Sequence, residues 1–129
     1  MDYLFVYGTL MRGYNHEMAH FLNNHSEFVG NAYFNGRLYE VAGFPGAVLS
    51  NNTSEKVYGQ VFMLNDAEKV FRVLDVYEGI ENTGLEPDLY KRLKVKTYLD
   101  VSEAMDVWVY IYNLPTQDLR LIPSGKYLE

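Results

Sequence analysis

Glu78 is the first candidate for acid–base chemistry, because it stands at the predicted end of a helix. Apolar residues recur before it at helical spacing, namely Ala67, Val70, Phe71, Leu74 and Tyr77. Gly79 follows, where helices commonly close with a left-handed residue. A carboxylate there faces the negative end of the helix dipole, and partial burial would raise its pKa enough for a general base. A solvated glutamate beside a glycine cap fits the same spacing, so both interpretations stay open.

A glycine-bounded loop is the second candidate. Gly8 and Gly13 enclose a turn that follows a short apolar run at residues 3–7. Successive backbone N–H groups in such a turn can hold a carboxylate or an oxyanion. The loop lacks the Gly-Lys-Ser/Thr ending of a phosphate-binding loop. The alternative is a plain turn between a strand and a helix.

A third pattern, H-E-x-x-H, occupies residues 16–20. On a helix, His16 and His20 would share one face and could bind zinc, with Glu17 as the base. A zinc hydrolase needs a third protein ligand, and His25 lies too close after the predicted helix end. The chain has no cysteine, which excludes thiolate ligands, thiolate nucleophiles and disulfides. An exposed helix is therefore the favoured interpretation, and we expect no metal site.

Hydrophobic patterning indicates the elements that would position these residues. Strands are expected at residues 3–7, 28–41, 47–49, 57–64, 90–99 and 104–112, and helices at about 15–22 and 65–78. Asn35-Gly36 predicts a hairpin turn within 28–41. Asn15 and Asn65 are the candidate helix caps. Both faces of 104–112 are apolar, which is typical of a central strand. This mixture predicts an α+β fold with a curved sheet or barrel.

Composition limits the functional classes. The chain has 129 residues, 48% of them apolar, so we expect a single domain over residues 1–129. The net charge of −6 argues against nucleic-acid binding, since such proteins carry a basic surface. The start of the chain lacks a signal peptide, and no apolar run approaches the length of a membrane helix. We therefore expect a cytoplasmic protein with no membrane partner.

Short motifs recur in a specific order along the chain: FVYGTL (5–10), GRLY (36–39), FPGAV (44–48), YGQVF (58–62), LDVYEG (74–79), YKR (90–92), VWVY (107–110) and IPSG (122–125). Together they resemble the γ-glutamylcyclotransferase-like family, particularly its γ-glutamylamine cyclotransferase and AIG2-like branch. The resemblance implies a small mixed β-barrel with flanking helices. It spans nearly the whole chain.

The resemblance also implies a reaction. Active members split a γ-glutamyl amide by attack of the substrate's own α-amine, which releases 5-oxoproline and a free amine. Glu78 would carry the proton, and backbone N–H groups of the substrate-binding residues Tyr7, Gly8, Thr9 and Leu10 would hold the carboxylate or oxyanion. No cofactor is implied, and the partner is a small γ-glutamyl compound. A non-catalytic small-molecule binding domain of the same fold is the alternative.

Two further residues, Tyr90 and Tyr110, are expected either to wall a pocket or to pack in the core of the sheet.

Overall fold

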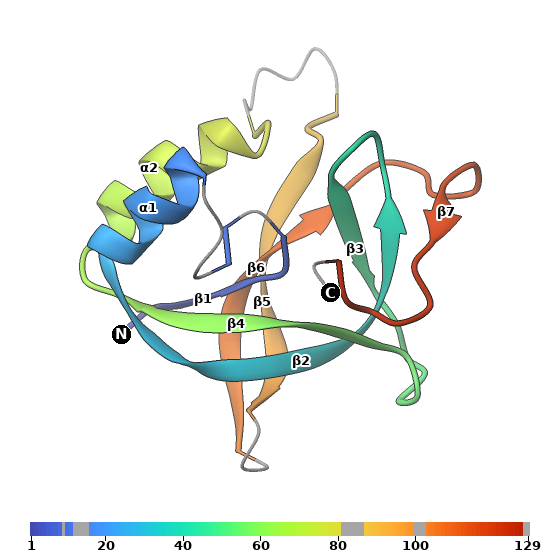
Figure 1. Ribbon diagram of the computed structural model, residues 1–129, viewed down its shortest axis with the longest axis horizontal. Coiled ribbons are helices and arrows are strands. Elements are labelled where there is room, and N and C mark those ends of the chain that lie inside the picture. The colour runs from blue at the N-terminus through green and yellow to red at the C-terminus, as the bar shows by residue number, and fades with distance from the viewer. Residues whose placement is uncertain (9, 12–15, 81–86, 100–102, 128–129) are drawn as a thin grey trace.

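The computed structural model describes residues 1–8, 10–11, 16–80, 87–99 and 103–127 (Figure 1). These residues form the following elements: β1 (Tyr3–Val6), α1 (Glu17–Asn24), β2 (Ser26–Glu40), β3 (Pro45–Leu49), β4 (Lys56–Leu64), α2 (Ala67–Tyr77), β5 (Tyr90–Leu99), β6 (Ala104–Tyr112) and β7 (Arg120–Leu121). The predicted α+β class is confirmed. Neither helix in this described part of the chain has the length and apolar character to cross a membrane.

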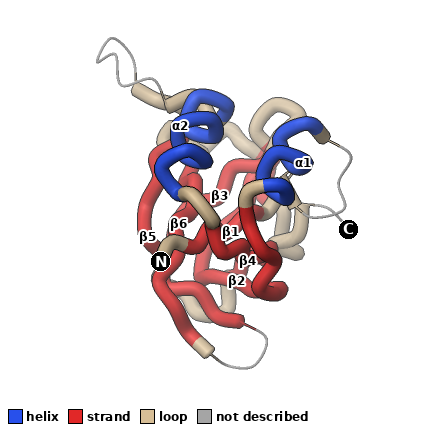
Figure 2. The backbone as a smooth tube through the Cα atoms, turned by 90° about the vertical axis from the view of Figure 1, so that its left-hand side faces the viewer, coloured by secondary structure: helices blue, strands red, loops and turns tan. Residues whose placement is uncertain are grey.

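The sheet closes into a five-stranded barrel. Its strands follow the order β2-β4-β1-β6-β5, and β5 returns to pair with β2 at Ala32↔Leu99 and Tyr33↔Tyr98. The β1–β6 pair is parallel and the other pairs in the ring are antiparallel, so the barrel is mixed, as predicted. Strands β3 and β7 add to β2 outside the ring. Figures 1 and 2 show both helices together on one side of the barrel.

Strand β6 separates two apolar layers. One face packs inside the barrel through Val107, Val109 and Ile111. The opposite face packs with the helices, and its residues are Trp108, Tyr110 and Tyr112. Both faces are apolar because β6 lies between β1 and β5 with a core on each side. The helix-facing layer is the one that brings α2 next to β6, and it therefore positions the site.

The hairpin predicted at Asn35-Gly36 is wrong. Strand β2 runs through both residues and changes partner there, since Asn35 pairs with Lys56 of β4 and Gly36 pairs with Leu49 of β3. A Cβ on Gly36 would lie 2.4 Å from the Val48 carbonyl oxygen and 2.7 Å from the Phe34 ring. The glycine is thus required for close approach of two strands, and pairing outweighs the local turn preference.

We expect Gly36→Ala to destabilise the protein by about 1–3 kcal/mol, because the new methyl group must push either the β3 backbone or a buried ring aside. Urea denaturation at equilibrium measures this loss. Gly30→Ala is the matched control on the same strand, since its Cβ would meet only Leu99 Cδ2, at 3.9 Å. An equal loss of unfolding free energy in the two variants would contradict the steric explanation.

A side chain caps the start of each helix. The cap of α2 is Asp66, whose carboxylate accepts the Lys69 N–H at 3.2 Å, so the predicted Asn65 cap is wrong by one residue. The cap of α1 is His16, whose Nδ1 accepts the Met18 N–H at 3.1 Å. The other predicted cap, Asn15, lies outside the described residues.

Candidate active site

Glu78 closes α2, as the sequence predicts. Gly79 has φ +77° and donates to the Val76 carbonyl at 3.1 Å, while Ile80 donates to the Asp75 carbonyl at 2.9 Å. This paired closure ends a helix abruptly and requires the left-handed conformation that glycine adopts without strain. The backbone after Glu78 consequently turns away at once, which leaves the carboxylate at a helix end.

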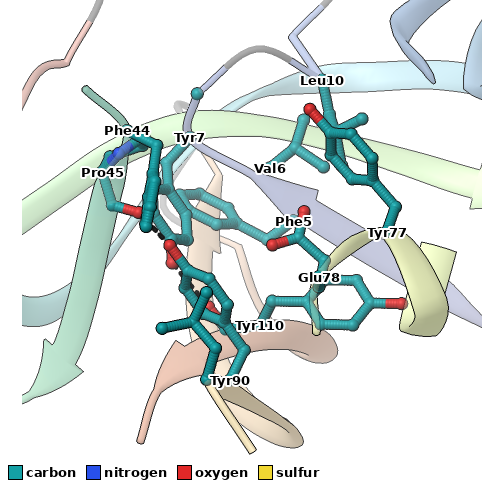
Figure 3. Close-up of a pocket in the computed structure, with 12 residues that line it drawn as sticks. Phe5, Val6, Tyr7, Leu10, Phe44, Pro45, Tyr77, Glu78, Tyr90 and Tyr110 are labelled. Carbon is teal, nitrogen blue, oxygen red and sulfur yellow. Dashed lines mark hydrogen bonds between the residues drawn. The ribbon is translucent and has the colours of Figure 1, made fainter. Parts of the chain in front are cut away.

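The carboxylate points into a cavity of about 260 Å³ (Figure 3). Its walls come from β1 and the loop after it, the start of β3, the end of α2, and strands β5 and β6. The lining residues are Phe5, Val6, Tyr7, Gly8, Leu10, Phe44, Pro45, Tyr77, Glu78, Leu89, Tyr90 and Tyr110. The structure thus brings Glu78 together with three of the four loop residues singled out from the sequence. The fourth, Thr9, lies outside the described residues.

Burial changes the acidity of Glu78. Loss of solvent raises the pKa of its carboxyl from 4.5 to about 7, and the negative charge of Asp75 adds to the rise. A carboxyl that titrates near neutral pH can both accept and return a proton. Burial also raises the pKa of the hydroxyls of Tyr7, Tyr90 and Tyr110, and the charge of Glu78 contributes to each. The three phenols therefore remain neutral.

The hydroxyls of Tyr7 and Tyr90 tie the cavity walls together. The Tyr7 hydroxyl donates to the Tyr110 carbonyl at 2.5 Å and accepts the Ala47 N–H at 3.3 Å. The Tyr90 hydroxyl donates to the Pro45 carbonyl. These bonds join β1 to β6 and β3, and β5 to β3. The hydrogen bonds of both tyrosine side chains therefore hold the walls of the cavity together.

A close contact holds the loop after β1 against β3. A Cβ on Gly8 would lie 2.7 Å from Pro45 Cγ and 3.3 Å from Pro45 Cδ. Both residues line the cavity. The absence of a side chain at Gly8 thus lets the backbone approach the proline ring, and this contact determines how close the loop after β1 lies to β3.

One polar group beside the cavity, formed by Asp75, Arg92 and Tyr110, is not predicted by any sequence motif. Asp75 pairs with Arg92 through two hydrogen bonds of 3.0 and 3.1 Å and accepts the Tyr110 hydroxyl at 2.6 Å. The alternation of residues 90–99 puts Arg92 with Lys94 and Lys96 on the polar face of β5, and so predicts no partner in the core for it. The available signal was the spacing of Asp75 from Glu78, since residues three apart share a helix face.

The H-E-x-x-H histidines are not a helical pair. His16 precedes α1 as its cap, with Nδ1 on the Met18 amide and Nε2 3.2 Å from the Tyr77 hydroxyl. Within the residues that the structure describes, no three His, Cys, Asp or Glu side chains are grouped to hold a metal ion. That part of the chain offers no zinc centre, and His16 instead connects the start of α1 to the end of α2.

Known proteins match both the sequence and this geometry. Residues 4–129 match the family described as Gamma-glutamyl cyclotransferase, AIG2-like. The chain belongs to this family. A relative from Methanocaldococcus jannaschii, provisionally named gamma-glutamylcyclotransferase MJ1514, is 32% identical over 128 residues, which cover 98% of this chain and 96% of the relative.

Solved structures share the fold of this chain. An AIG2-like protein from mouse superimposes with a TM-score of 0.73 at 20% identity, covering 99% of this chain and 88% of the mouse chain, so it shows the shared fold. YkqA from Bacillus subtilis superimposes with a TM-score of 0.71 at 25% identity. The match covers 98% of this chain, which spans 39% of the length of YkqA.

Proposed function

We propose that this γ-glutamyl cyclotransferase family member cleaves a γ-glutamyl amide to 5-oxoproline and a free amine. The observation that carries the proposal is the meeting, in one cavity, of the loop after β1 and a partly buried carboxyl whose pKa is raised to about 7. The Glu78 carboxyl is suited to proton transfer. The loop after β1 offers backbone N–H groups for an anion.

The first step closes the ring. Glu78 as a carboxylate takes a proton from the α-ammonium of the substrate, and the freed nitrogen attacks the γ-carbonyl carbon. A carbon–nitrogen bond forms, and the carbonyl electron pair moves onto oxygen. Backbone N–H groups of the loop, those of Gly8 and Leu10 among them, stabilise the resulting oxyanion or hold the substrate carboxylate.

The second step releases the amine. Glu78, now protonated, donates its proton to the amide nitrogen while the oxyanion collapses and the original amide bond breaks. This donation returns Glu78 to the carboxylate. The ring nitrogen gives its second proton to the released amine, so the products are 5-oxoproline and a free amine in its ammonium form. No water is consumed, since the attacking and leaving nitrogens both belong to the substrate.

The cavity walls support an intramolecular reaction. A flexible γ-glutamyl chain must fold back on itself, and holding two reacting groups in the right geometry contributes about 7–11 kcal/mol to catalysis. The aromatic and apolar walls from Phe5, Phe44 and Leu89 restrict that folding. Positioning together with one proton carrier is a sufficient catalytic set for this chemistry.

The direct test is release of 5-oxoproline from a panel of γ-glutamyl amides that differ only in the leaving amine, followed by chromatography. We expect release from at least one compound. Ligand-induced rise of the melting temperature without any release would favour the alternative, a binding domain with the same cavity.

The activity should depend on pH through Glu78. Only the carboxylate can accept the first proton, and its pKa is raised to about 7, so we expect kcat/KM to rise about tenfold per pH unit below 7 and then level off. Rates measured in overlapping buffers between pH 5 and 8 check this limb. An acid limb near pH 4.5 would mean that the reacting carboxyl is solvated, against the burial described above.

A further inference from the structure

Asp75 links the end of α2 to two strands of the barrel. Its carboxylate receives two hydrogen bonds from the Arg92 guanidinium on β5 and one from the Tyr110 hydroxyl on β6. The charged side chains are each only 24% exposed. Such forked pairs have a defined geometry, which isolated surface ion pairs lack. Asp75 stands one helical turn before Glu78, so whatever fixes Asp75 also fixes that turn.

The Arg92 side chain is itself held in place. Its guanidinium carbon lies 3.9 Å from the centre of the Phe71 ring and 4.8 Å from that of Trp108. Phe71 belongs to α2 and Trp108 to β6, so the guanidinium lies between the helix and the strand. Stacking on aromatic faces adds to the hydrogen bonds and restricts the rotation of the arginine.

Tyr110 connects both halves of the cavity. Its hydroxyl donates to Asp75, next to the acid, and its backbone carbonyl accepts the Tyr7 hydroxyl, next to the glycine loop. We infer that Asp75, Arg92 and Tyr110 form a positioning unit that holds the Glu78 end of α2 at a fixed place relative to the loop after β1. This role is additional to the proton transfer by Glu78 and rests on the proposed function.

The unit also acts through charge. The titratable and charged groups around Glu78 in the described residues are Asp75 and Tyr77 on α2, Tyr7 directly after β1, Tyr90 and Arg92 on β5, and Tyr110 on β6, with His16 on the far side of Tyr77. The raised pKa values of Tyr7, Tyr90 and Tyr110 keep these three phenols neutral, and the charges that contact the helix turn of Glu78 are those of the Asp75–Arg92 ion pair. Asp75 opposes ionisation of Glu78. Because Arg92 is paired with Asp75, its positive charge should offset that of Asp75. Removal of Asp75 should therefore lower the pKa of Glu78, and removal of Arg92 should raise it.

The experiment follows the Glu78 carboxyl by ¹³C NMR titration of the full chain. We expect the midpoint to fall in Asp75→Asn and to rise in Arg92→Gln, each by about half a pH unit. Arg72→Gln is the control, since Arg72 pairs with Glu68 on the exposed side of the same helix. Arg92→Lys keeps the charge and should hold the midpoint near that of wild type. If Asp75→Asn does not fold, the two Arg92 variants carry the test.

Kinetics supply the second measurement. Tyr110→Phe removes only the hydroxyl, and we expect kcat to fall about tenfold with little change in KM, because a small displacement of a catalytic group is costly. Midpoints that shift in the same direction, or equally in Arg72→Gln, would overturn the inference. If wild type releases no 5-oxoproline but the opposite shifts occur, the positioning unit stands and the proposed reaction fails.

Discussion

We expect Glu78→Gln to lower kcat/KM for 5-oxoproline release by about 10²–10⁴-fold while the protein stays folded. Glutamine has nearly the same shape as glutamate but neither takes nor returns a proton at neutral pH. Initial rates on a γ-glutamyl amide that wild type accepts measure the loss, and circular dichroism checks the fold. Binding should survive, because the walls and the loop are unchanged.

The control for this substitution is Glu68→Gln. Glu68 lies on the same helix, but its side chain is 86% exposed and pairs with Arg72. Its loss should leave the rate unchanged. If Glu78→Gln retained full activity, another group would have to carry the proton and the proposed mechanism would be wrong.

The same variant should change the dependence of stability on pH. The pKa of Glu78 is raised in the folded state, so ionisation favours the unfolded chain as pH rises from about 4.5 to about 7. Wild type therefore loses stability over this window. Glutamine removes the loss, and we expect Glu78→Gln to be more stable than wild type by roughly 1–3 kcal/mol at pH 8 and no more stable at pH 4. Thermal unfolding at the two pH values measures the difference.

The second large effect is expected at Gly8, where alanine should lower kcat/KM by about 100-fold. The new methyl group would lie 2.7 Å from Pro45 Cγ, so the loop after β1 must move away from β3. This movement displaces the backbone N–H groups relative to Glu78. The rate on an accepted γ-glutamyl amide measures the effect.

Relief of the same contact provides the control. In the Gly8→Ala/Pro45→Ala double variant the proline ring is gone, and we expect part of the lost activity to return. A double-mutant cycle isolates the coupling between the two positions. Strictly additive losses would indicate that Gly8 acts through something other than its contact with Pro45.

Much of the fold was predictable because several segments have one strong local pattern. Strands β5 and β6 occupy the predicted residues 90–99 and 104–112, since alternation over nine or ten residues has no competing interpretation. The end of α2 at Glu78 followed from a glycine after the last apolar turn. The failure at Asn35-Gly36 has the opposite cause, because there two other strands decide the conformation of residues that would form a turn on their own.

The residues of the candidate site were likewise only partly predictable from the sequence. Glu78 and the loop after β1 could be singled out because each is a local motif. The Asp75–Arg92 pair could not, since its members are a helix residue and a strand residue that meet only after the barrel closes. Likewise, the contact of Gly8 with Pro45 depends on the start of β3 meeting the loop after β1, which no local spacing predicts.

The parallel pairing of β1 with β6 has a consequence for biosynthesis. Leu4 and Phe5 pair with Trp108 and Val109, and the bond between Tyr7 and Tyr110 joins residues 103 positions apart. Contacts between such distant segments form slowly, because a long loop must close first. While the ribosome still holds β6, strand β1 lacks its parallel partner and the Tyr7 hydroxyl lacks the Tyr110 carbonyl. A nascent chain therefore completes the walls of the candidate site only after β6 has been synthesised.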